Sequence, residues 1–319
     1  MTTSDVPSRR YRSRRRVRLT RTIVVLAAFI VVVTGVVYGV SSIGHHRTVS
    51  DSCQVVGETT GTIYSFDPEQ LLNASIIADV AMRRGLPQQA VVVGLATAQQ
   101  ESKLRNLDYG DLDSVGLFQQ RPSQGWGTSQ QILDPVYSSG KFFDALVRVR
   151  SWQTLTVAAA AQAVQRSGFP EAYASWQQLG TALGAALTGA TASQLTCRLG
   201  HPGVDVKGHP GSGATSLTAA VGTLTAELAS DLQVTSPVIG TQGTKSATIT
   251  VLGLGLDAKG SDATAIHRTA TVSAWALAHA PVGITRVVVG DQEWRPDRDG
   301  WQHTAAAAAG TVVMTVAAR

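Results

Sequence analysis

The stretch that decides the fold is residues 100–127, which read QESKLRNLDYGDLDSVGLFQQRPSQGWG. Glu101 and Ser102 end a predicted helix that opens at Pro87 with a proline in its first turn. A turn-rich loop over 106–114 follows, and residues 115–120 predict a short strand or hairpin arm. Apolar periodicity predicts helices before it from residue 67 and after it near 129–133, 135–149, 156–167 and 170–188. This order predicts a mostly helical domain over 67–198 with one small β-hairpin.

The same stretch resembles the lysozyme-like superfamily, specifically the soluble lytic transglycosylases and goose-type lysozymes. Their motif is Glu-Ser, a loop, Gly-Leu-Met-Gln and a nearby Pro. Here Glu101-Ser102 is followed by Gly-Leu-Phe-Gln at 116–119 and by Pro122. The resemblance covers about residues 67–190, and residues 100–127 also resemble actinobacterial membrane-anchored proteins that share this signature. It implies a lysozyme-like fold that acts on peptidoglycan glycan strands.

Glu101 is the candidate catalytic residue. Cleaving a glycosidic bond requires a proton donor at the leaving oxygen, so a carboxyl must stay protonated near neutral pH. A helix C-terminus favours that state because its negative pole disfavours the carboxylate. The resemblance implies that the Gly116 backbone and Gln119 line the sugar groove, and that Phe118 stands in its apolar wall. Ser102 is either a helper of Glu101 or an ordinary helix residue.

The reaction route is open at this stage. A hydrolase normally uses a second carboxylate, and Asp108, Asp111 and Asp113 in the loop are candidates. The resemblance implies another route, in which one Glu acts as acid and then as base. The substrate's own N-acetyl group then stabilises the cation, and an internal hydroxyl closes an anhydro ring. No cofactor and no metal site is predicted.

The chain departs from the family in its third motif, Ala-Tyr-Asn-Ala-Gly on a later helix. Residues 160–168 read AAQAVQRSG, without the Tyr and the Asn. Gln165 and Tyr173 are the candidate substrate-binding replacements. Two functions therefore remain: a lytic transglycosylase or muramidase that cleaves the MurNAc–GlcNAc bond, and a non-catalytic cell-envelope binding or scaffold protein with a degenerate groove.

Charge is concentrated at one end of the 319-residue chain. The formal net charge is +5, but residues 1–21 hold eight arginines and one acid, which leaves 19 basic and 21 acidic residues in the rest. This distribution disfavours a nucleic-acid-binding body. A charged fraction of 15% and a mean hydropathy of +0.07 exclude a chain that is disordered throughout.

Residues 22–44 form an uncharged apolar run, as long as the about 20 residues that span a bilayer as a helix. Arginines before it predict a cytoplasmic tail over 1–21, so the chain is expected to be a single-pass type II protein of the cell membrane with its bulk outside. The alternative is a cleaved signal peptide, whose apolar core is roughly 7–15 residues. Residues 45–66 are polar and are predicted to form a stalk.

An oxidising compartment predicts a disulfide between Cys53 and Cys197, with two unpaired thiols as the alternative.

Residues 199–215 are rich in Gly and Pro and predict a linker. Residues 216–319 predict a small α+β accessory domain for positioning or for contact with an envelope protein, with helices near 216–232 and 261–280 and strands near 247–253, 284–290, 291–295 and 311–317. Its Trp294 and Trp301 flank an Asp-Gly turn and are expected to pack in the core or across strands, with stacking on sugar rings as the alternative. The predicted fold class is α+β throughout, behind an N-terminal transmembrane helix.

Overall fold

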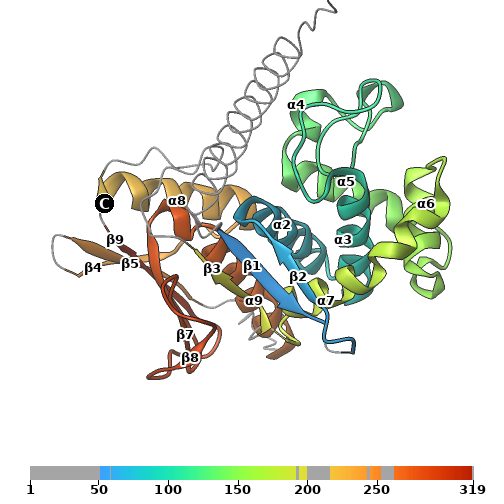
Figure 1. The fold of residues 1–319 in the computed structure, drawn as a ribbon. Helices are drawn as coiled ribbons and strands as arrows, with labels where there is room; N and C mark the ends of the chain where they lie inside the picture. Colours follow the sequence, from blue (N-terminus) through green and yellow to red (C-terminus); the bar gives the residue numbers. More distant parts are fainter. Residues whose placement is uncertain are drawn as a thin grey trace, which may run out of the picture. The chain divides into compact units, whose positions relative to one another are not determined.

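The computed structural model describes residues 51–57, 59–191, 194–199, 216–242, 245–252 and 262–317. The chain from residue 50 onward forms one compact unit. Its described residues build eight helices, α2 to α9, and two antiparallel sheets of three and six strands (Figure 1). The described fold is therefore α+β.

The described residues do not support the predicted membrane-spanning helix. No helix of the described residues is both long and apolar enough to cross a membrane. The longest, α9 (Asp262–Ala278), has 17 residues, fewer than the about 20 that a bilayer requires. Residues 22–44 and the tail 1–21 lie outside the described part of the chain. The fold class is corrected accordingly, and the expected single-pass type II location in the cell membrane is not supported by the structure.

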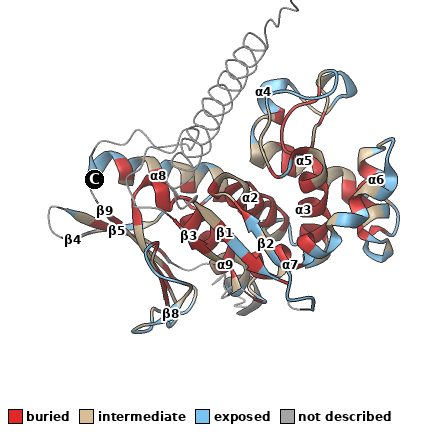
Figure 2. Ribbon diagram, in the orientation of Figure 1, coloured by how far each residue is buried: buried red, intermediate tan, exposed pale blue. Residues whose placement is uncertain are grey.

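Two adjacent helices, α2 (Pro68–Arg83) and α3 (Gln88–Ser102), form the centre of the helical part. Asp67 and Gln70 cap α2 reciprocally, since each side chain accepts a hydrogen bond from the other's backbone N–H. Most of α3 is buried (Figure 2). Helix α7 (Gln177–Leu187) packs against it, and a Cβ at Gly180 would lie 2.9 Å from the Val92 carbonyl oxygen. Glycine at this position therefore allows the two helices to approach closely.

The remaining helical elements surround α3. They are η1 (Pro122–Gln124), α4 (Ser129–Ile132), α5 (Pro135–Arg148), η2 (Trp152–Thr154), α6 (Val157–Gln165) and η3 (Pro170–Trp176). Helix α4 begins with a capping box between Thr128 and Gln131. Helices α5 and α6 and the 3-10 helix η3 all contact α3. The elements that follow the Gly-Leu-Phe-Gln turn thus pack around the helix that carries Glu101.

The small sheet has the order β2-β1-β3 and consists of β1 (Ser52–Val56), β2 (Ile63–Phe66) and β3 (Thr196–Arg198). The residues from 52 to 66 were expected to be part of a stalk, but they contribute two strands instead. Cys53 and Val55 are buried, as strand alternation requires. Cys53 lies opposite Cys197 in the register and is bonded to it, so the predicted disulfide is confirmed.

The large sheet has the order β4-β5-β9-β6-β7-β8. Its strands are β4 (Val238–Gln242), β5 (Ser246–Val251), β6 (Ile284–Val289), β7 (Gln292–Trp294), β8 (Gln302–His303) and β9 (Val312–Ala317). Buried residues alternate along β5 and β9. Helix α8 (Leu217–Leu232) contacts both strands, and α9 contacts β6 and β9 and is followed by the short η5 (Ala280–Val282). The strand β4 was not predicted, and residues 200–215 of the expected linker lie outside the described residues.

Helix α9 packs against α2, so the C-terminal segment and the helical segment share one hydrophobic core. The Asp79 carboxylate is fully buried at this contact and pairs with Arg83 of its own helix and with Arg268 of α9, at 3.9 Å. Burial raises the pKa of Asp79, and the two arginines oppose this shift. A second link is the Trp294 indole, which donates to the Cys197 carbonyl at 3.0 Å.

Candidate functional site

Glu101 lies in the last turn of α3, and the backbone behind it is unusual. Lys103 and Leu104 both have a left-handed conformation, with φ of 57° and 59°. Residues other than glycine enter this region at a cost in free energy. Two side chains of α2 hold the turn, because Gln70 Nε2 donates to the Lys103 carbonyl and Asn73 Nδ2 donates to the Leu104 carbonyl, each at 2.8 Å. The end of α3 is therefore fixed.

Ser102 fastens the end of α3 to the Gly-Leu-Phe-Gln turn. Its buried hydroxyl lies 2.8 Å from the Leu117 carbonyl oxygen and 3.1 Å from the Ala98 carbonyl oxygen of its own helix. The turn itself closes by reciprocal backbone hydrogen bonds between Val115 and Gln120, at 3.0 and 3.1 Å. Ser102 is thus placed to position Glu101 relative to this turn.

Gly116 and Gln119 shape the turn. Gly116 has a φ of 78°, and a Cβ there would lie 2.8 Å from the Ile132 carbonyl oxygen, so glycine fits where other residues would clash. Gln119 also has a positive φ, of 47°. Its Nε2 donates to the carbonyls of Gly116 at 3.2 Å and Tyr109 at 3.3 Å. The Gln119 side chain therefore braces the turn against the preceding loop.

The Phe118 ring is fully buried and stacks on Phe142 of α5, with 4.5 Å between the ring centroids. It belongs to the hydrophobic core in this structure. Its backbone carbonyl faces the site, because it accepts a hydrogen bond from Gln165 Nε2 at 2.9 Å. The apolar residue of the motif thus anchors the turn through its ring and contributes to the site through its carbonyl.

The structure brings Glu101, Gln165 and Tyr173 together. Glu101 Oε1 accepts hydrogen bonds from the Tyr173 hydroxyl at 2.5 Å and from Gln165 Nε2 at 3.1 Å. Burial raises the pKa of Tyr173, and the nearby Glu101 carboxylate raises it further, so this hydroxyl remains a donor. No described residue donates to Glu101 Oε2. One carboxylate oxygen is therefore held by two donors while the other is available to a ligand.

Of the three loop acids, Asp113 is engaged elsewhere. Its carboxylate accepts hydrogen bonds from Arg121 Nε at 2.7 Å and from the Ser123 backbone N–H at 2.8 Å. These contacts, chiefly the one with Arg121, hold the pKa of Asp113 below its ordinary value. Asp108 and Asp111 are exposed.

Gln100 and Trp176 are two further residues at the site that were not predicted from the sequence. The Trp176 indole of η3 donates to Gln100 Oε1 at 2.6 Å, and the Lys103 ammonium lies 4.3 Å from the centroid of the Trp176 ring. Gln100 and Trp176 are 76 positions apart. The adjacency of Gln100 to Glu101 was the one available signal, and nothing in the sequence marked Trp176.

No protein-family model matches this chain, and no curated protein matches it.

Proposed function

We propose that this protein is a lysozyme-like glycan-cleaving enzyme of the lytic transglycosylase or muramidase type, with peptidoglycan as its substrate and Glu101 as general acid and base at the MurNAc–GlcNAc bond. The observation that carries the proposal is the pair of hydrogen bonds from Tyr173 and Gln165 to Glu101 Oε1. They orient a carboxyl at the end of α3, next to the turn that completes the family-like motif.

The two donors suggest how the carboxyl works. With Oε1 held, Oε2 carries the proton that passes to the glycosidic oxygen as the bond to the leaving sugar breaks. The resulting carboxylate then takes a proton from the nucleophile. Asp113 is already paired with Arg121, and Asp108 and Asp111 are exposed on the loop. We favour the single-carboxylate route, in which that nucleophile is a hydroxyl of the substrate and an anhydro sugar forms.

The contacts also bear on the missing third motif. The family places a Tyr and an Asn on a later helix, and here Gln165 ends α6 while Tyr173 follows in η3. A phenol and a carboxamide are thus present, although from different positions. Gln165 Nε2 also contacts the Phe118 carbonyl, so a single amide connects the catalytic carboxyl with the Gly-Leu-Phe-Gln turn. We take these contacts as support for a functioning site.

The test is clearing of purified peptidoglycan in a zymogram by the full-length chain and two variants. Glu101→Gln should reduce product release by about 10²–10⁴-fold, the range that general acid–base catalysis contributes. Glu171→Gln removes an exposed carboxylate from η3 and serves as the control, which should clear like the parent. Mass spectrometry of the products distinguishes anhydro from hydrolysed sugars. A parent protein that clears nothing contradicts the proposal.

A non-catalytic cell-envelope binding or scaffold protein is the second candidate. One observation favours it: four of the residues expected to bind substrate are buried, namely Ser102, Gly116, Phe118 and Tyr173. A degenerate groove would show this pattern. Under this reading the chain sediments with purified peptidoglycan without releasing soluble fragments, and Glu101→Gln sediments equally well.

A further inference from the structure

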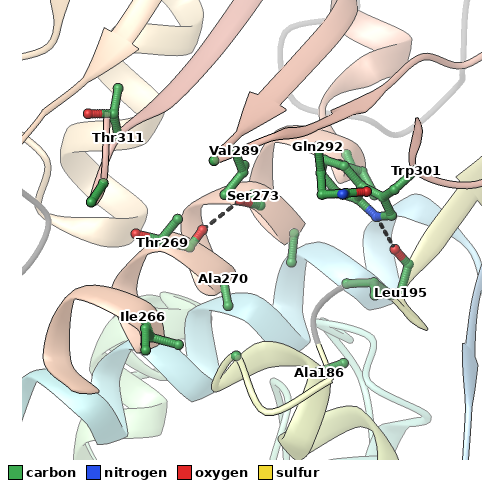
Figure 3. A pocket seen from close by; sticks show the side chains of 16 residues that line it. Ala186, Leu195, Ile266, Thr269, Ala270, Ser273, Val289, Gln292, Trp301 and Thr311 are labelled. Carbon is green, nitrogen blue, oxygen red and sulfur yellow. Dashed lines mark hydrogen bonds between the residues drawn. The ribbon is translucent and has the colours of Figure 1, made fainter. Parts of the chain in front are cut away.

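A cavity of about 520 Å³ lies away from Glu101, between α9, the end of α7 and the strands of the large sheet (Figure 3). Ala270 and Ala274 of α9 form one wall, and Trp301 and Ala309 belong to the wall contributed by the segment between β7 and β9. Its volume falls within the range of about 300–1,000 Å³ that is typical of small-molecule sites. It shares no residue with the candidate active site.

Hydrogen bonds made by its own lining residues hold the walls of this cavity in place. The Trp301 indole donates to the Leu195 carbonyl at 2.7 Å, a bond that is drawn in Figure 3. The Ala307 backbone N–H donates to the Gly290 carbonyl at 2.7 Å, which holds the segment before β9 against the turn after β6. Small side chains on α9 leave the space between these walls empty. The void therefore follows from the way the walls are built.

The lining defines what would fit. None of the described residues that line the cavity carries a charge, and most of them are apolar or small. A charged guest would lose its hydration without gaining a counter-ion, which is costly. Apolar cavities of this kind take up apolar guests.

One polar group in the lining points to a specific contact. The Thr311 side chain lines the cavity and is only 6% exposed, yet no described residue forms a hydrogen bond with its hydroxyl. A hydroxyl in a mostly apolar wall that has no protein partner can pair with an oxygen atom of a ligand and so fix the ligand's orientation. We propose that this cavity binds a neutral, mostly aliphatic small molecule that carries one hydroxyl or carbonyl group, which pairs with Thr311.

The experiment uses photolabelling of the full-length chain with a dodecanol analogue that carries a diazirine. Mass spectrometry should locate the label in peptides that contain residues 266–277 and 301–311, and excess dodecanol should abolish it. Ala309 lines the cavity at an exposed position, and Ala309→Trp places a large side chain there, which should weaken labelling at these peptides at least tenfold. Ala308→Trp adds the same ring at the next residue, which is also exposed but lies outside the lining, and it should label like the parent.

Two further arms test the chemistry. Thr311→Val keeps the shape of the side chain without its hydroxyl and should weaken labelling three- to tenfold. Analogues that end in a carboxylate or an ammonium group should label these peptides at least tenfold less than the alcohol does. The proposal is overturned if the parent shows no saturable label in these peptides, if the two tryptophan variants behave alike, or if a charged analogue labels as well as the alcohol. Because Glu101 takes no part, each result is independent of any activity on peptidoglycan.

Discussion

Replacing Tyr173 by Phe removes one hydroxyl and keeps the buried ring. The lost contact is the 2.5 Å hydrogen bond to Glu101 Oε1, the shorter of the two that hold this oxygen. Hydrogen bonds to charged groups contribute about 1.5–3 kcal/mol. At about 1.36 kcal/mol for each factor of ten in rate, this corresponds to a loss of roughly 10- to 150-fold. Since Gln165 still holds the oxygen, we expect the lower part of this range, about 10- to 30-fold.

The assay is release of soluble fragments from purified peptidoglycan over a range of substrate concentrations. A carboxyl that is misoriented in the transition state lowers kcat and leaves KM nearly unchanged, whereas a general loosening of the fold changes both together with the melting temperature. Tyr137→Phe is the matched control, because it removes a tyrosine hydroxyl that donates to the Trp126 carbonyl at 3.2 Å. If Tyr173→Phe retains the kcat of the parent, the Tyr173 hydroxyl does not orient Glu101 Oε1 for the reaction.

Three further predictions concern stability, each measured by urea denaturation. Replacing Cys53 and Cys197 by Ala opens a loop whose ends are 144 positions apart, and should lower the free energy of unfolding by about 5 kcal/mol. Asp79→Ala leaves two arginines without their buried partner and should lower the free energy of unfolding by about 3 kcal/mol. Asp144→Ala removes the partner of an arginine in an exposed ion pair and should lower it by less than about 1 kcal/mol. Hydrogen bonds from two arginines lower the pKa of Glu293 from 4.5 to about 2. As the pH drops from 4.5 towards 2, the unfolded chain binds a proton at this residue before the folded chain does, so the free energy of unfolding should fall over this range. Glu293→Gln should flatten this pH dependence.

Features that depend on neighbouring residues could be predicted from the sequence. The helix that opens at Pro87 and ends at Ser102 was predicted from its first-turn proline and its apolar pattern, and α3 spans Gln88–Ser102. The alternating apolar residues of β5 and β9 likewise required only the two-residue period of a strand. The strands β1 and β2, in the segment that begins at Ser52, were not predicted. The polar composition of this segment indicated a stalk and hid the short alternation of buried and exposed residues around Cys53.

Glu101, Gln165 and Tyr173 were named as candidates from the sequence, but their geometry was not predicted. Gln165 and Tyr173 could be chosen as candidates for polar groups near Glu101, but they lie 64 and 72 positions away from it. That both donate to the same oxygen depends on how α6 and η3 pack on α3, which no local pattern encodes. Phe118 shows the converse, since its place in the motif suggested a groove wall whereas the packing of Phe142 buries its ring.

Helix α7 connects the candidate active site with the cavity. It starts directly after Trp176, which is bonded to Gln100, and its residue Ala186 lines the cavity about 15 Å further along, at 1.5 Å per residue. Gly180 allows the same helix to pack closely against α3. The Ala309→Trp substitution lies in a wall outside α7, so it fills the cavity without altering this helix. A loss of activity in that variant would therefore mean that the occupant of the cavity, through α7, affects the site around Glu101, and unchanged activity would mean that the two sites act separately.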